Sequence, residues 1–465
     1  MKDIPLPATG KVLGEPSVRA LSAALRGGLL RPGDDGYDRA RTLWNAMTEN
    51  RPAVIARCAG AADVIHCVRF AREHDLLVSV RGGGHNVAGN AVCEGGLMID
   101  LSPMKSVRVE PVARTARAEP GVLWGEFDRE TQAFGLATTG GQVSTTGIAG
   151  LTLGGGEGWL ASKYGYAIDN LLSADVVTAD GRLTTASATA NEDLFWALRG
   201  AGHNFGVVTS FEYRLHPLGT VLGGMVLHPF ERAKDVLRFY REFGASVPDE
   251  LTTIAGILTA PDGNLMVALV ACYSGALEEG ERVLAPLRRF GLPVGDTIGP
   301  LPYTVMQTLF DAALPPGRLN YWKSSLMSQF GNEVIEAIVE HARRIPSPFS
   351  GVFIPHYHGA FSRVGKRDTA YYHRDLQYEL LILSSWINPV DSEANISWTR
   401  ELFQAVQTQG RGAVYVNMLD RDEGERRVQE AYGMNYERLV ALKNKYDPTN
   451  FFRLNQNIRP DAIGV

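Results

Sequence analysis

The sequence predicts an α+β protein built from two domains. Its 465 residues exceed what one ordinary hydrophobic core serves, so two cores are expected. Up to about residue 217, short apolar strands alternate with helices and with glycine-rich segments. From about residue 218 the pattern changes to strands that alternate with amphipathic helices, and the residues from about 425 return to helix and loop. A domain boundary is therefore expected near residue 217.

Composition indicates a globular enzyme rather than a nucleic-acid or membrane protein. Hydrophobic residues make up 45% and charged residues 21% of the chain, whose net charge is −5 without a basic cluster. The N-terminal residues lack the apolar segment of a secretion signal, and no segment predicts a membrane anchor. The four cysteines, without CxxC spacing, are Cys58, Cys67, Cys93 and Cys272. We therefore expect a cytoplasmic enzyme with reduced thiols and no thiolate metal site.

The expected elements of the first part begin with a helix over residues 61–76. Its apolar residues Val64, Val68 and Ala71 fall on one helical face together with Ile65. Short buried strands are expected at 76–80, 95–102 and 106–111. A further helix over residues 121–135 is expected to end at Gly135.

A hairpin, a capped helix and a strand complete this first part. Asp180-Gly181 separates two β-prone runs within residues 171–187, which predicts a tight hairpin turn. Asn191 stands where the cap of a helix over residues 191–200 is expected. Residues 206–217 then predict a strand that closes the region.

The segment RGGGHN, residues 81–86, directly follows a predicted strand. Consecutive glycines after a strand are typical of a backbone nest whose N–H groups bind phosphate oxygens. The residues that follow lack helical periodicity and lack GK[ST], which excludes both a Rossmann fingerprint and a Walker loop. The residues alone leave two interpretations open, a phosphate-binding nest and a plain turn.

Two further glycine-rich segments favour a ligand over a series of turns. Residues 140–158 read GGQVSTTGIAGLTLGGGEG, and residues 199–208 read RGAGHNFGVV. Glycine lets backbone amides approach a large flat ligand closely. The alternative for residues 140–158 is a solvated linker, but the interleaved Ile148, Leu151 and Leu153 argue against it. Three such segments together indicate one extended cofactor.

These motifs resemble those of a known family. RGGGHN, TTGIAGLTLGGGEGWLASKYGYAIDNLLSADVVTADG and EDLFWALRGAGHNFGVVT resemble the PCMH-type FAD-binding domain of the vanillyl-alcohol-oxidase superfamily. The tail YDPTNFFRLNQNI resembles the C-terminal signature of its berberine-bridge-enzyme-like branch, and the chain is similar to bacterial FAD-linked oxidases of the 6-hydroxynicotine oxidase type. The likeness is strong over residues 50–217 and 425–460. The residues between them share only the overall alternation of strands and helices.

The resemblance implies a two-domain PCMH-type fold. Residues 1–217 plus 425–465 would form the FAD-binding domain. Residues 218–424 would form a substrate-binding domain, an antiparallel sheet with helices on its outer side and the flavin on the other.

The resemblance also gives the histidine of RGGGHN a role. In the family the glycine nest binds the FAD pyrophosphate, and the next histidine is bonded to the flavin 8α-methyl carbon. His85 would be that residue, because a neutral imidazole is nucleophilic at neutral pH. Many relatives carry a cysteine as a second tether where this chain has Val143, and Cys93 lies elsewhere. A single bond through His85 is therefore expected.

Position by position, the resemblance implies a set of FAD-contacting residues. They come from the three glycine-rich segments, from a turn near residue 170 and from the C-terminal tail: Arg81, Gly82, Gly83, Gly84, His85, Asn86, Gly89, Gly140, Gly141, Ser144, Thr145, Thr146, Gly147, Gly150, Leu151, Gly155, Asp169, Asn170, Gly206, Val207, Val208, Asn455 and Asn457.

Candidates for substrate chemistry lie mostly in the second domain. The family stretch Tyr-x-Asn-Tyr, whose second tyrosine often acts as base, is matched by VYVNML, which retains Tyr415 and Asn417 but has a methionine in place of that base. His356 and His358, which share one face of a strand, and Tyr372 are further candidates for a proton acceptor. For each of these residues the alternative is a structural polar group.

The implied activity is oxidation of an alcohol, sugar hemiacetal or amine carbon of a small-molecule substrate by covalently bound FAD, with dioxygen as acceptor. Two alternatives remain. One is a dehydrogenase of the same fold that uses another acceptor, and the other is a flavin-bound sensor or redox-neutral tailoring enzyme. A homo-oligomer is compatible with the sequence, which predicts no metal, nucleic-acid or membrane partner.

Overall fold

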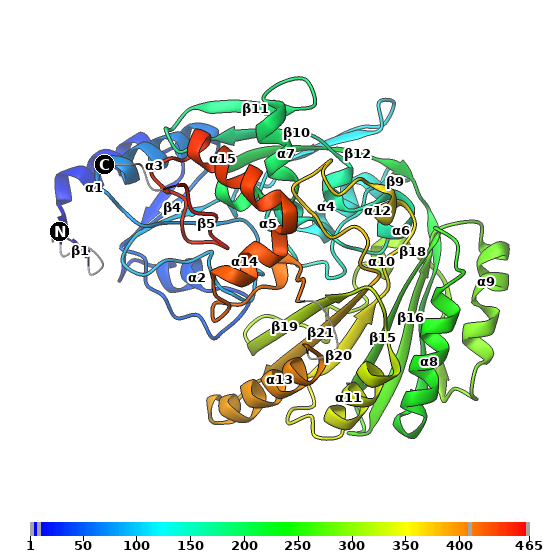
Figure 1. Cartoon of the computed structure of the whole chain (residues 1–465). Helices are drawn as coiled ribbons and strands as arrows, with labels where there is room; N and C mark the ends of the chain where they lie inside the picture. Colours follow the sequence, from blue (N-terminus) through cyan, green and yellow to red (C-terminus); the bar gives the residue numbers. More distant parts are fainter. Residues whose placement is uncertain (1–3, 7–10, 408–411, 462–465) are drawn as a thin grey trace.

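The computed structural model describes residues 4–6, 11–407 and 412–461 (Figure 1). It contains helices and three larger sheets, mostly antiparallel, which confirms the predicted α+β class. Within these described residues, no helix is both long and apolar enough to span a bilayer.

The first sheet lies near the N-terminus. Its strands, in spatial order, are β3 (Gly28–Leu30), β4 (Val54–Arg57), β6 (Leu97–Asp100) and β5 (Val78–Arg81), and β4 and β5 run parallel to β6. Helices α1 (Glu15–Ala24), α2 (Tyr37–Arg41) and α3 (Ala61–Glu73) accompany it, and β1 (Ile4–Leu6) pairs with β2 (Lys11–Leu13). Helix α3 confirms the predicted helix but ends earlier, since Asp75 has a left-handed φ of 52°.

The second sheet is antiparallel throughout. Its order is β11 (Leu183–Ser187), β10 (Leu171–Val177), β12 (Val207–Arg214), β8 (Thr115–Ala118) and β7 (Val107–Glu110). Gly181, with φ of 73°, closes the predicted hairpin between β10 and β11.

Helices pack over this sheet, and two differ from the sequence prediction. They are α4 (Trp124–Gln132), α5 (Ile148–Gly154), α6 (Ala161–Tyr164) and α7 (Glu192–Ala201), with 3₁₀ turns η1 (Ala167–Asp169) and η2 (Gly202–Asn204); β9 (Leu136–Ala137) pairs with β13 (His216–Pro217). Helix α5 lies inside a glycine-rich segment that predicted no helix. Asn191 occupies the N-cap position of α7 but does not cap it, because its backbone is left-handed (φ 48°, ψ 52°) and not extended as in a capping residue. Its Nδ2 donates to Thr184 Oγ1 and Thr185 O.

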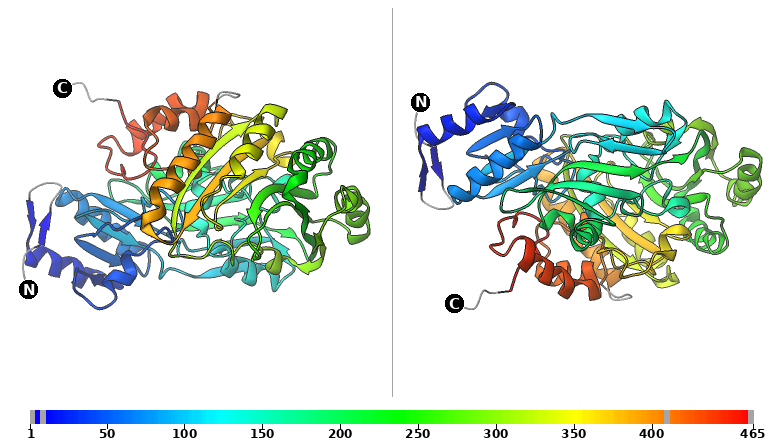
Figure 2. Two further views of the ribbon diagram at one scale, coloured as in Figure 1. Left: turned by 90° about the horizontal axis from the view of Figure 1, so that it is seen from below. Right: turned by 90° about the horizontal axis from the view of Figure 1, so that it is seen from above.

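The third sheet is the largest and is antiparallel. Its order is β17 (Gly295–Asp296), β14 (Thr220–Pro229), β16 (Leu265–Tyr273), β15 (Leu251–Thr259), β20 (Gly351–Pro355), β21 (Tyr378–Trp386) and β19 (Leu319–Met327), with β18 (Gly299–Pro302) paired to β14. Helices α8 (Ala233–Gly244), α9 (Leu277–Arg289), α11 (Asn332–Ala342) and α13 (Ser392–Gln407) cover its outer face (Figures 1 and 2). Shorter helices are η3 (Phe230–Arg232), α10 (Tyr303–Met306), α12 (Ala360–Arg363) and η4 (Pro389–Asp391).

Side chains alternate across this sheet because successive strand residues point to opposite faces. On β15, Ala255 and Ile257 pack with the outer helices, whereas Ile254 packs on the other side with Trp159 and Tyr303. The inner face of the third sheet is therefore turned toward the glycine-rich segments of the first part.

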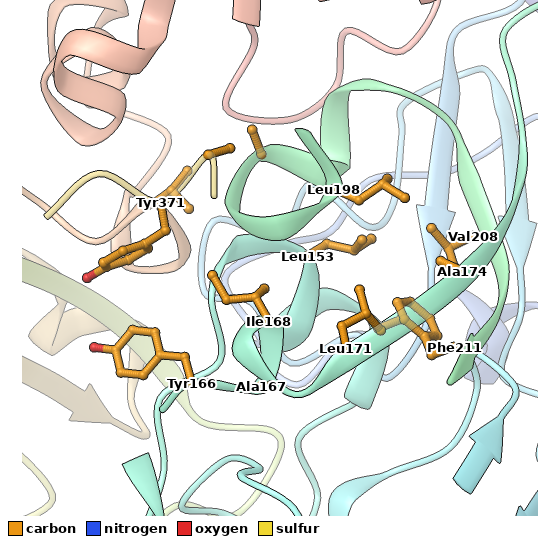
Figure 3. Packing of buried hydrophobic residues seen from close by; sticks show 14 of the residues in the cluster. Leu153, Tyr166, Ala167, Ile168, Leu171, Ala174, Leu198, Val208, Phe211 and Tyr371 are labelled. Atoms are coloured by element: carbon orange, nitrogen blue, oxygen red, sulfur yellow. The ribbon is translucent and has the colours of Figure 1, made fainter. Parts of the chain in front are cut away.

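The C-terminal residues return to the first part of the chain. They form η5 (Val416–Met418), α14 (Glu425–Tyr432), η6 (Gly433–Asn435) and α15 (Tyr436–Tyr446), drawn in orange and red beside α5 and α7 in Figure 1. Phe451 and Phe452 join the core of the first sheet. Figure 3 shows the neighbouring core, where Leu153 of α5 and Leu198 of α7 pack near Phe211 of β12.

Candidate functional site: a cavity walled by glycine

A cavity of about 880 Å³ lies between the glycine-rich segments and the inner face of the third sheet. One wall consists of residues 82–87, 146–147, 149–151 and 206–208, and the C-terminal residues 454–456. The opposite wall comes from strands β14, β15, β20, β21 and β19 together with residues 309–310 and 312–314. A volume of this size suits a large organic ligand.

Glycine is required where two segments of the first wall meet. A Cβ atom on Gly83 would lie 2.6 Å from both Cα and N of Gly147, and one on Gly82 would lie 2.9 Å from the carbonyl oxygen of Pro120. These neighbours are backbone atoms, which have no side-chain rotamer that could relieve the clash. The glycines of RGGGHN therefore bring its backbone against the 140–158 segment and leave no side chain between backbone and cavity.

Substitution Gly83→Ala should separate these two segments and empty the cavity of its ligand. We expect at least a tenfold lower content of bound cofactor per chain, because inserting a methyl group between backbones typically costs 1–3 kcal/mol, about one to two powers of ten. The measurement is visible absorbance per chain after purification. Gly219→Ala is the control, since Gly219 has no atom within 4 Å of its added Cβ and should retain the ligand of the wild type.

His85 is a buried imidazole in this wall. Its ring stacks on Trp44, with centroids 4.5 Å apart and planes 19° apart. Burial lowers the pKa of His85 to about 4, so the imidazole is neutral at neutral pH. Its Nε2 atom is buried and lacks a hydrogen-bond partner among the described residues. A neutral, oriented and unpartnered imidazole nitrogen at a cavity wall can act as a nucleophile.

The C-terminal tail closes the cavity beside His203. Asn455 Nδ2 donates to the carbonyl oxygens of His203, at 2.8 Å, and Phe452, at 3.0 Å. The Oδ1 atoms of Asn455 and Asn457 are buried without a partner in the described part of the chain. Buried amides normally find partners, so these two acceptors are suited to a ligand or to ordered water.

Asn417 and Tyr415 connect the tail region to α5. Asn417 lines the cavity, and its Nδ2 donates to Leu151 O at 3.0 Å and to the Tyr415 hydroxyl at 2.8 Å. The same hydroxyl accepts the Gly156 N–H at 2.8 Å, and Tyr415 itself is buried below the cavity wall. Asn86 Nδ2 donates to Asn417 O at 2.9 Å. Tyr415 therefore orients Asn417.

The structure brings many of the predicted cofactor residues to this cavity. Those that line it are Gly82, Gly83, Gly84, His85, Asn86, Thr146, Gly147, Gly150, Leu151, Gly206, Val207, Val208 and Asn455. The others lie behind or beside the wall: Arg81, Gly89, Gly140, Gly141, Ser144, Thr145, Gly155, Asp169, Asn170 and Asn457.

Several residues of the second group have structural partners. Asp169 forms a two-contact ion pair with buried Arg374, each contact 2.8 Å long. The N–H and hydroxyl of Ser144 bond to Asp311, at 2.9 and 2.5 Å. Arg81 donates to the carbonyl oxygen of Ala40.

The histidine pair and Tyr372 lie away from the cavity. The rings of His356 and His358 stack with centroids 4.9 Å apart, on one side of the strand as predicted, and His356 lies against Gly244 of helix α8. His358 Nε2 lies 2.9 Å from the carbonyl oxygen of Leu251. Tyr372 contacts Gly433 and the ammonium group of Lys366. Their catalytic role stays a prediction.

Some cavity residues were not expected from the sequence. Among them are Glu157 and Gln142. The apolar wall across from the glycines includes Met225, Ile254, Leu258, Leu309, Phe310, Phe353, Leu381 and Leu383. One signal was available for Glu157, since a lone charged residue within the apolar, glycine-rich run GGGEGWL is unusual in a buried segment.

Sequence comparison identifies related families and proteins. The family described as "FAD binding domain" matches residues 52–187, and the family "Berberine and berberine like" matches residues 414–459. The (R)-6-hydroxynicotine oxidase of Paenarthrobacter nicotinovorans is 34% identical over 461 residues, covering 95% of this chain and 99% of that protein. An FAD-linked oxidoreductase of Dictyostelium discoideum is 32% identical over 448 residues, covering 95% of this chain and 97% of that protein.

Solved structures agree with these matches. The 6-hydroxy-D-nicotine oxidase of Arthrobacter nicotinovorans superposes with a TM-score of 0.87 at 31% identity, covering 94% of this chain and 98% of that one. A chitooligosaccharide oxidase gives a TM-score of 0.86 at 26% identity, covering 96% of this chain and 100% of that one. Together with the glycine-walled cavity, these matches confirm FAD as the cofactor and the resemblance predicted from the motifs. The chain therefore belongs to the berberine-bridge-enzyme-like family of FAD-linked oxidoreductases.

Proposed function

We propose that this FAD-dependent oxidoreductase oxidises an alcohol, sugar hemiacetal or amine carbon of a small molecule, with FAD bonded to His85 and with dioxygen as the electron acceptor. The observation that carries the proposal is the neutral His85, whose unpartnered Nε2 belongs to the wall of a cavity built from glycine.

The residues present fit FAD. Gly82, Gly83 and Gly147 form a wall in which a Cβ would clash, so backbone amides there are free of side-chain cover. The unpartnered Asn455 Oδ1 offers an acceptor at the other end. We assign the remaining cavity residues of the three glycine-rich segments to the same cofactor. Bound FAD supplies the acceptor for the hydride that leaves the substrate carbon.

A single covalent bond follows from the side chains in the second segment. Val143 lines the cavity where a second tether would come from a cysteine. Cys93 is buried outside the cavity, and burial raises the pKa of its thiol, which keeps it protonated and unreactive. Formation of the His85 bond removes one hydrogen from the imidazole and one from the 8α-methyl group, and reduction of dioxygen to hydrogen peroxide accounts for both.

The proposal also assigns a role to each of the two domains. Residues 1–217 with 425–465 hold FAD, and residues 218–424 supply the wall against which substrate packs. On that side Asn417, oriented by Tyr415, presents an amide to the cavity. A cytoplasmic location, with no nucleic-acid or membrane partner, is consistent with the charge and with the free, buried cysteines.

The experiment is turnover with a panel of an amine, an aromatic alcohol and an oligosaccharide, for example (R)-6-hydroxynicotine, benzyl alcohol and chitobiose. An oxidase consumes one dioxygen and forms one hydrogen peroxide for each substrate carbon oxidised, which an oxygen electrode and a peroxidase assay measure. Reduction of a dye without oxygen uptake would show that the enzyme uses an electron acceptor other than dioxygen. If no probe of any class bleached the flavin anaerobically, the proposed oxidation would be wrong.

A further inference from the structure

A chain of buried acidic groups ends at the cavity wall. The hydroxyl of Tyr357 bonds to Glu157 Oε2 and lies 2.6 Å from Glu379 Oε2, while Ser324 Oγ donates to Glu379 Oε1. The three residues Glu157, Tyr357 and Glu379 are at most 6% exposed. Of these three, Glu157 lines the cavity. We refer to them below as the carboxyl relay.

Strand pairing explains why these side chains meet. The bridge between His356 and Tyr378 is antiparallel, so Tyr357 lies opposite Gln377, to whose carbonyl oxygen its N–H donates. Glu379 is then the diagonal neighbour of Tyr357 on the face opposite to His356. Leu326 of β19 pairs with Glu379 of β21, and Ser324, two residues away, points to the same face. The alternation that turns His356 toward α8 therefore turns Tyr357 to the opposite, cavity side.

Hydrogen counting shows that the relay holds a proton. Tyr357 carries one hydroxyl hydrogen, yet its oxygen is within hydrogen-bond distance of two carboxyl groups. One contact uses that hydrogen, and the other requires a hydrogen on a carboxylic acid. Ser324 donates to Glu379, which favours Glu379 as the ionised member and Glu157 as the protonated one.

The surroundings support a single shared proton. Burial raises the pKa of Glu157 well above its ordinary value, and the charge of Glu379 raises it further; burial also raises the pKa of Glu379. The facing groups are neutral tyrosines, Tyr166, Tyr371 and Tyr415, whose pKa values burial raises. The cation behind them, Arg374, is paired with Asp169. Figure 3 shows the hydroxyls of Tyr166 and Tyr371 pointing away from the aliphatic core.

We propose that the carboxyl relay is the proton acceptor for substrate oxidation, a role that rests on the proposed function. Glu157 takes the proton of the substrate O–H or N–H on its cavity side, and its own hydrogen passes through Tyr357 to Glu379. The substrate carbon loses a hydride to bound FAD, and its single bond to oxygen or nitrogen becomes double. The two carboxyl groups of the relay thus hold one proton before the reaction and two protons after it. Glu157 is a catalytic residue, and Tyr357 passes the proton from Glu157 to Glu379.

A first test needs no substrate. Infrared spectra of wild type and Glu157→Gln, each with bound flavin at pH 7, are subtracted. Asp128, a further buried carboxyl whose pKa burial raises, is present in both proteins and cancels. The wild type should show one additional carbonyl stretch of a protonated carboxyl group, which moves to lower frequency in heavy water. A featureless difference spectrum would overturn the shared proton and with it the relay.

A second test measures anaerobic flavin reduction by (R)-6-hydroxynicotine, benzyl alcohol or chitobiose across pH. Tyr357→Phe and Glu379→Gln should slow reduction about 100-fold with little change in the concentration giving half-maximal rate, because positioned proton acceptors contribute about 10²–10⁴-fold. The wild-type rate should fall in acid as the relay takes its second proton, and Tyr357→Phe should lose this limb. Tyr371→Phe, the same change on a neighbouring buried tyrosine, should retain the wild-type rate and profile.

The outcomes separate the relay from the oxidation itself. If wild type reduces its flavin but Tyr357→Phe matches Tyr371→Phe in rate and pH profile, the relay is overturned and the oxidation stands. If wild type reduces its flavin with none of the probes, the proposed oxidation fails, and the infrared band alone then shows whether the shared proton exists. Equal flavin content among the variants excludes a folding defect.

Discussion

His85→Ala should release its flavin on acid denaturation, leaving a colourless pellet, whereas the wild-type pellet stays yellow. The reason is that the imidazole is the nucleophile of the proposed bond: its Nε2 is unpartnered within the described structure, and burial holds its pKa near 4. The expected change is from one flavin per chain to none in the pellet. Absorbance of pellet and supernatant measures it.

The other histidine on the cavity wall provides a matched control. His203 also lines the cavity, and burial lowers its pKa, but its Nε2 lies 3.0 Å from the carbonyl oxygen of Gly150. His203→Ala should therefore keep flavin in the pellet. If the pellet of His203→Ala lost the yellow colour and that of His85→Ala kept it, FAD would be bonded to His203, and the proposed bond to His85 would be wrong.

Lys443→Met should destabilise the protein by about 3–5 kcal/mol, since it leaves the buried carboxylate of Asp447 without its cation. Lys443 of helix α15 and Asp447, the residue that follows this helix, are both fully buried, and Lys443 Nζ lies 2.7 Å from Asp447 Oδ2. The ammonium group also donates to the carbonyl oxygens of Asn204 and Phe452, each at 2.9 Å. Asp447 in turn accepts the N–H groups that follow α15. The pair therefore fastens the C-terminal tail to the first part of the chain.

The measurement is the free energy of unfolding from chemical denaturation. Lys445→Met, two residues along the same helix, removes an exposed ion pair with Asp193 and should cost less than about 1 kcal/mol. Equal costs for the two lysines would show that the buried pair does not hold the tail.

The cofactor wall could be predicted from sequence because glycine reports a backbone requirement directly. Only a residue without Cβ fits where Gly83 meets Gly147, so the glycine pattern in the sequence already indicates that two backbone segments meet closely there. Helix α5 escaped prediction because its glycines lower helix propensity, which burial of Ile148 and Leu153 overrides.

The substrate side could not be predicted in the same way. The strand alternation was right for His356 and His358, but sequence alone does not say which face of a two-sided sheet meets the ligand. Tyr357, assigned to the opposite face, is the residue that reaches toward the cavity. Glu157 and Glu379 lie far apart in sequence. Strand register, a long-range property, brings Tyr357 beside Glu379, and Tyr357 in turn reaches Glu157.

The most direct test is peptide mass spectrometry of the denatured wild-type protein. The account predicts that the proteolytic peptide containing His85 carries FAD less two hydrogen atoms, and that the peptides containing Val143, Cys93 and His203 are unmodified. A His85 peptide of unmodified mass would contradict it.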